Sequence, residues 1–333
     1  HWPVVAVLPF TATSGSDQDQ QLADSLSDAI GTALSKFTRL VVVPHKEGDE
    51  TDYVIEGRIH HAEDSLRVAA QLLEQADGSQ VWAEAYDRGL ALRSDFALQD
   101  EIVAQIAGTL GNDLGPLWMA ELQTFVRKPL ADYNAFDCYL LTVTYFHNFA
   151  PTEHAEAMDC LEAVVEREPD GHFPWLDSAW LIFQEHAYGH NPRPEPLERA
   201  LAAGQRAKAL SPNDYNVYWI LAKIQHARQA RLDAFHALAE QAVALNPYNT
   251  ELLADMGTWI AYAGEWQRGR ELIERTMRLD PSHGSWMYFP LFLDLFRQGL
   301  YREALVEAQK INLPQNHMIQ GGLAAVYGKV GDN

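Results

Sequence analysis

Five prolines divide the second half of the chain into segments of similar length. Each follows an apolar run with helical spacing: Pro169, Pro212, Pro247, Pro281 and Pro314. Their successive separations are 43, 35, 34 and 33 residues. Proline lacks the backbone N–H that a continuing helix needs, so each one ends a helix and turns the chain into the next segment. This part of the chain is therefore constrained to repeat one structural unit.

The interval between two prolines holds two helices. Apolar residues recur at three- and four-residue spacing in the second helix of each unit: Leu197–Leu210, Leu232–Leu245, Gln267–Leu279 and Tyr301–Ile311. A period near 34 residues with two helices per unit is typical of tetratricopeptide repeats, whose arrays present surface and rarely carry out chemistry. We expect an all-α solenoid over 131–333, with about five and a half repeats. The first unit, Tyr133–Asp170, matches most loosely, and the last is truncated after Gly331.

The first 115 residues follow a different pattern. Five segments read as strands, because they are short and apolar or alternate apolar and polar residues: Val4–Phe10, Leu40–Val43, Tyr53–His61, Ser65–Glu74 and Gln80–Asp87. Two segments carry apolar residues on one helical face: Gln18–Phe37 and Ser94–Leu110. This order indicates an α+β domain over 1–115, in which two helices cover one face of a small mixed sheet. Residues 116–130 form either a linker or an extension of the second helix.

Charge and motifs limit the functions open to the chain. The net charge of −21 opposes direct contact with nucleic acid or an anionic lipid surface. No run of about 18 apolar residues predicts a transmembrane helix. A glycine-rich phosphate loop, a Gly-x-Ser-x-Gly elbow and a His-Glu-x-x-His helix are all absent from the sequence. We therefore expect no catalysis and no cofactor. The chain begins without methionine and stops within a repeat, so we expect a fragment of a longer protein.

Histidines and cysteines raise two further hypotheses. His60 and His61 are neighbours on a strand, so their side chains point to opposite faces and do not readily share a metal ion. His186 and His190 flank a segment that favours a loop, and we expect no metal site there either. Two cysteines fall at similar heights in the paired helices of the first repeat: Cys138 and Cys160. They are either reduced and packed or joined in a disulfide.

Two surfaces are candidates for binding a partner. The first is the concave face formed by the first helix of each repeat, where aromatic side chains could anchor an extended peptide or a small ligand. The candidate residues on this face are Trp180, Phe183, Trp219, Lys223, His226, Thr258 and Tyr262. The alternative is that the aromatic rings only pack between neighbouring repeats.

The second surface is the outer face of the sheet in the first 115 residues. Strand alternation predicts that polar and aromatic side chains lie opposite the apolar set that includes Ile55 and Val68. The candidate residues on the outer face are Arg58, His60, Arg67, Trp82 and Tyr86. A face of this kind docks either a partner or the chain's own repeat array.

Several segments of the chain resemble a known bacterial domain. Six are similar to the amino-terminal-like domain of TolB: Val5–Phe10, Leu22–Leu26, Tyr53–Gly57, Leu66–Leu72, Val81–Asp87 and Phe96–Ile102. In that family the domain is commonly followed by tetratricopeptide repeats. The tandem resembles the carboxy-terminal regulatory region of bacterial class III adenylate/guanylate cyclases, and also regions behind winged-helix transcriptional regulators and some serine/threonine kinases. Ser285–Leu291 and Ile311–Pro314 look most like the cyclase-linked arrays, whereas Pro44–Thr51 is shorter than the matching segment of relatives.

The resemblance implies a non-catalytic regulatory or sensory module, with a membrane-anchored class III nucleotide cyclase as the parent protein. Its implied partner is a protein or peptide, or a small ligand, and not a nucleic acid. A periplasmic location follows from the same resemblance, with the cytoplasm as the alternative. Two other functions stay open: an oligomerisation or envelope scaffold that forms a homodimer, and the regulatory half of a winged-helix transcriptional regulator.

Overall fold

The chain folds into two compact units, His1–Asn249 and Thr250–Asn333. The structure is a computed structural model that describes residues 1–44, 50–62, 65–89, 95–228, 232–280, 283–312 and 317–331. Each unit has its own clusters of buried apolar side chains. Within the described ranges, no helix has the length and hydropathy needed to cross a bilayer. Several sequence predictions fall outside these ranges: the helix start at Ser94, Pro281, Pro314 and most of Pro44–Thr51.

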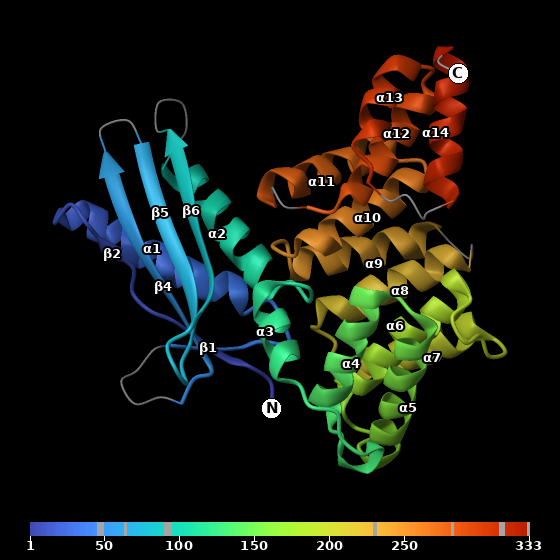
Figure 1. Ribbon diagram of the computed structural model, residues 1–333, viewed down its shortest axis with the longest axis horizontal. Coiled ribbons are helices and arrows are strands. Elements are labelled where there is room, and N and C mark those ends of the chain that lie inside the picture. The colour runs from blue at the N-terminus through green and yellow to red at the C-terminus, as the bar shows by residue number, and fades with distance from the viewer. Residues whose placement is uncertain are drawn as a thin grey trace. The chain divides into compact units, whose positions relative to one another are not determined.

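A mixed sheet forms the start of the first unit (Figure 1). Its strands are β1 (Val4–Val7), β2 (Thr11–Ala12), β3 (Val41–Pro44), β4 (Tyr53–Ala62), β5 (Ser65–Glu74) and β6 (Gln80–Gly89). The strand order is β3-β1-β4-β5-β6, with β2 also paired to β4. β1 runs parallel to both of its neighbours, whereas β4, β5 and β6 form an antiparallel meander. Apolar residues alternate along β4 and β5, so one face of the sheet is dry and the other is open.

Two helices cover the dry face of the sheet. They are α1 (Asp17–Leu34) and α2 (Asp95–Gly111). Their buried side chains, among them Ile30 and Ile106, share one core with Ile55 and Val68 of the sheet. Gly57 is required in this core, because an added Cβ would lie 2.2 Å from the Phe10 ring. The predicted α+β part of the fold is confirmed.

Helices make up the rest of the chain. After α3 (Pro116–Thr124), the first unit continues with α4 (Ala135–Asn148), α5 (Pro151–Arg167), α6 (His172–Tyr188), α7 (Pro196–Leu210), α8 (Tyr215–Ala227) and α9 (Leu232–Leu245). The second unit contains α10 (Thr250–Tyr262), α11 (Trp266–Leu279), α12 (Tyr288–Arg297), α13 (Tyr301–Gln309) and α14 (His317–Val330). Pro169, Pro212 and Pro247 each stand two residues beyond a helix end, as the repeat pattern predicts. The predicted all-α array is confirmed.

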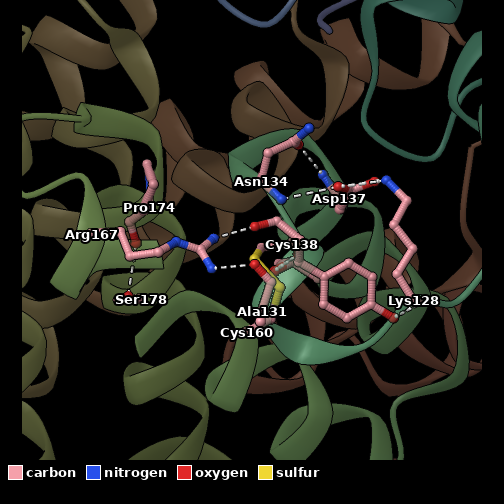
Figure 2. Close-up of a disulfide and its surroundings, with 11 residues drawn as sticks. Lys128, Ala131, Asn134, Asp137, Cys138, Cys160, Arg167, Pro174 and Ser178 are labelled. Atoms are coloured by element: carbon pink, nitrogen blue, oxygen red, sulfur yellow. Dashed lines mark hydrogen bonds and ion pairs between the residues drawn. A yellow bond between two sulfur atoms is a disulfide. The ribbon is translucent and has the colours of Figure 1, made fainter. Parts of the chain in front are cut away.

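The first helical hairpin, α4–α5, carries a covalent link. Cys138 on α4 and Cys160 on α5 are fully buried and joined by a disulfide, with 5.5 Å between their Cα atoms (Figure 2). Around it, the Arg167 guanidinium donates hydrogen bonds to the Ala131 and Tyr133 carbonyl oxygens. The Lys128 ammonium donates to the Asp137 carboxylate at 2.9 and 3.0 Å. These contacts hold the segment that precedes α4 against the hairpin.

Candidate functional site

Three aromatic rings form a row along the first helices of successive repeats. They are Phe146 on α4, Trp180 on α6 and Trp219 on α8, and we call them the aromatic row. The Trp180 ring meets the other two nearly at right angles, with centroid distances of 6.2 Å to Phe146 and 5.0 Å to Trp219. Edge-to-face contacts at such distances add stabilisation beyond the area that they bury. Trp219 is only 8% exposed, whereas Trp180 and Phe146 are partly exposed. The row therefore packs between repeats and also contributes to the surface.

Lys223 and Phe183 border the aromatic row. The Lys223 Nζ lies 5.3 Å from the Trp180 centroid and 5.7 Å from that of Phe183, which places a cation against two ring systems. Phe183 is itself buried. His226 packs against Phe235 with 5.2 Å between the ring centroids. Burial lowers the pKa of His226, and the nearby His236 lowers it further. Trp180, Phe183, Trp219 and Lys223 thus occupy one neighbourhood, whereas His226 contacts α9.

The remaining two residues predicted for the concave face belong to the second unit. Thr258 is buried, and its hydroxyl donates a hydrogen bond to the Ala254 carbonyl of its own helix at 2.8 Å. Tyr262 lies between Trp259 and Trp266, with centroid distances of 6.0 Å to each. Burial raises the pKa of Tyr262. Both side chains are thus engaged within the second unit.

The outer sheet face departs from the prediction at β6. Arg58, His60 and Arg67 are exposed on the open face, where His60 pairs with Arg67 across β4 and β5. Trp82 and Tyr86, however, pair with Leu72 and Val68 and so point to the helix-covered side. Tyr86 is 4% exposed and belongs to the core. The predicted placement of Trp82 and Tyr86 is wrong, because the larger side chains of β6 enter the core and leave alanines facing outward.

The open face is hollowed over these alanines. The hollow has a volume of about 620 Å³, and small residues of β5 and β6 line it, including Ala69, Ala83 and Ala85. Arg58 borders it. Elsewhere on the same face Arg67 pairs with Asp87, its Nη2 lying 2.8 Å from Oδ2. These positions are exposed, so the repeat helices of the same unit, α4 to α9, do not cover them. None of the described His, Cys, Asp and Glu side chains gather in a group of three or more that could hold a metal ion.

Sequence reasoning missed the contact between the α+β part and the repeats, which we call the junction. At its centre Arg39 from the α1–β3 connection forms an ion pair with Asp177 of α6. The two residues are 4% and 2% exposed. The Arg39 guanidinium carbon lies 4.1 Å from the Tyr139 ring centroid and 4.9 Å from that of Phe173. Each charge offsets the desolvation cost of burying the other. Loss of either residue would therefore leave an uncompensated buried charge.

Further junction contacts come from the turns between successive repeats. The Trp2 ring lies 4.4 Å from Phe173 at the start of α6. Phe37 meets Tyr215 at the start of α8, with 6.3 Å between their centroids. The Asn246 amide, just after α9, donates to the Lys36 carbonyl oxygen at 3.3 Å. Three consecutive repeats therefore hold one α+β body.

No family model matches the chain. The chain is 30% identical to "Putative adenylate cyclase 3" of Rhizobium meliloti (strain 1021) in a match of 183 residues that covers 50% of this chain. It spans only 30% of the length of that curated relative.

Solved structures that resemble the chain include helical-repeat proteins. TTC0263, a thermophilic TPR protein of Thermus thermophilus, is 18% identical and covers 58% of this chain and 98% of its own, with a TM-score of 0.46. PilW, a type IV pilus biogenesis factor, is 14% identical over 60% of this chain and 86% of its own, with a TM-score of 0.47. YrrB, a TPR protein described as having an unusual peptide-binding site, is 14% identical over 62% and 96%, with a TM-score of 0.38.

Proposed function

We propose that this chain is the regulatory binding region of a bacterial signalling protein, and that its parent is a membrane-anchored class III nucleotide cyclase. The aromatic row with Lys223 carries the binding part of the proposal, because ordered aromatic edges beside a cation offer anchors at low entropic cost. The proposed ligand is an extended segment of a protein partner. The stretch of 30% identity to an adenylate cyclase supports the choice of parent.

The proposed location is the periplasm. The buried Cys138–Cys160 disulfide supports it, because such bonds persist in oxidising compartments and are rare in the reducing cytosol. In this proposal the upstream part of the parent crosses the inner membrane, and the bound state of the repeats is passed to the cyclase. Such transmission requires a ligand that binds two conformations with different affinity.

A peptide selection tests the binding proposal. Peptides selected from a random display library on the intact chain would be measured by calorimetry against the wild type and two variants. We expect Trp180→Ala and Lys223→Met to weaken binding at least about tenfold. Trp175→Ala is the matched control, since Trp175 lies on the same helix and its Nε1 donates to the Pro169 carbonyl at 2.9 Å. Equal losses in all three variants, or no selected peptide, would contradict the proposal.

The parent is tested separately with the full-length gene product. Cyclase activity that changes on adding a selected peptide is the expected result. A product with a winged helix and no cyclase activity would move the assignment to a transcriptional regulator. A chain that selects no peptide but forms a dimer of constant affinity would instead be a scaffold.

A further inference from the structure

The junction holds more negative charge than positive charge. Three carboxylates interact there: Asp177 on α6 forms the ion pair with Arg39, Asp113 between α2 and α3 acts on both of them, and Asp214 just before α8 acts on Asp177. Asp113 is partly buried, whereas Asp177 and Asp214 are almost wholly buried. One guanidinium compensates one carboxylate, so the cluster carries an excess of negative charge whenever all three are ionised.

Asp214 is the least compensated member of the cluster. Its Oδ1 accepts a hydrogen bond from the Asn216 backbone N–H at 2.9 Å and so begins α8. Its Oδ2 accepts no hydrogen bond within the described part of the chain. The His172 ring lies beside it, with Nε2 3.5 Å from that oxygen. A buried carboxylate oxygen that accepts no hydrogen bond is costly, because it has lost its contact with water without replacement.

Burial and neighbouring negative charge raise the pKa of two carboxylates in the cluster, Asp177 and Asp113. Burial raises the pKa of Asp177 to about 6, and Asp113 and Asp214 add to the shift while Arg39 opposes it. Burial likewise raises the pKa of Asp113, again against Arg39. Tyr139, which packs on Arg39, has its pKa raised by burial and by Asp113, so its phenol stays protonated across this range. Burial, Asp113 and Asp214 likewise raise the pKa of Tyr215 at the start of α8, so this phenol also stays protonated. Arg39 and His172 also face the cluster.

We propose that the junction is a proton-dependent clasp, in which uptake of protons by the carboxylate cluster fastens the α+β part to the repeats. The sign follows from linkage: the docked state binds more protons than the open state, so acidification favours the docked state. The effect is present at about pH 5 and is lost as the pH rises to about 7.5, through the range in which Asp177 ionises. The clasp concerns the junction and does not depend on the proposed peptide ligand or parent protein.

Hydrogen exchange of the intact chain tests the clasp. Peptides that cover Arg39 and the start of α6 report the opening of the junction, after correction for the chemical exchange rate at each pH. For one proton we expect an opening constant about tenfold smaller at pH 5 than at pH 7.5. Asp177→Asn should reduce that ratio to within about twofold, whereas the exposed Asp159→Asn on α5 should retain it.

A second variant keeps the test decisive if Asp177→Asn does not fold. Asp113→Asn leaves the Arg39–Asp177 ion pair in place and removes one excess charge. We expect it to increase protection of the junction at pH 7.5 and to shrink the pH ratio. A wild-type ratio near one, a ratio in the opposite direction, or a full tenfold ratio in Asp113→Asn would overturn the proposal.

Discussion

The aromatic row and the junction are built on the same three helices by different chemistry. Helices α4, α6 and α8 supply the row through uncharged rings in edge-to-face contact. The same helices supply the junction through Tyr139, Asp177 and Asp214, where one guanidinium meets several carboxylates. Apolar contacts do not change with protonation, whereas a buried cluster of like charges does. One set of helices therefore carries both the proposed binding face, whose ring contacts do not depend on pH, and the junction, for which we propose a response to pH.

Removal of the junction's cation should have the largest effect. Arg39→Met keeps much of the side-chain volume but leaves Asp177 buried without its partner. We expect the free energy of unfolding of the first unit to fall by about 3–5 kcal/mol, measured by urea denaturation at pH 7.5. The control is Arg58→Met, since Arg58 is exposed and forms no ion pair with any described residue, and its effect should stay within about 0.5 kcal/mol. Comparable losses in the two variants would mean that the junction is not a distinct source of stability.

Removal of the disulfide should rank second and should not depend on pH. The bond joins residues 22 apart, and replacing both Cys138 and Cys160 by alanine frees that loop in the unfolded chain. The expected loss is about 3 kcal/mol, with the same value at pH 5.5 and at pH 7.5. Urea denaturation of the double variant at both pH values provides the measurement. A loss confined to one pH would show that the hairpin is coupled to the carboxylate cluster.

Truncation in the aromatic row should have the smallest effect of the three. Trp180 is partly exposed, so Trp180→Ala should cost about 2 kcal/mol, less than the loss of a fully buried tryptophan. The cost should again be equal at both pH values, because Phe146 and Trp219, the rings that Trp180 meets edge to face, do not titrate. Thermal unfolding of the variant and the wild type across the pH range checks this. A pH-dependent difference would remove the distinction between the row and the junction.

Periodic features of the fold could be predicted from the sequence, and non-periodic ones could not. The regular interval between prolines and the spacing of apolar residues indicated the helical array, and strand alternation indicated the sheet, because each of these patterns recurs along the sequence. Alternation alone leaves two possible faces, and for β6 the wrong one was chosen although Trp82 and Tyr86 are its largest side chains. Arg39 and Asp177 stand 138 residues apart and belong to no pattern, so only the folded chain brings them together. The binding role of Trp180 and its neighbours stays a prediction.

The contacts at successive repeat turns have a mechanical consequence. A solenoid bends by small rotations between neighbouring repeats, and each repeat normally constrains only the next. Phe173, Tyr215 and Asn246 lie at three successive junctions between repeats, yet all three contact the same α+β part. Because it contacts several repeats at once, the α+β part couples the rotations between neighbouring repeats. In an array without this part, those rotations would be independent. An extra repeat inserted between α6 and α8 would break this alignment even if it stacked perfectly on its neighbours.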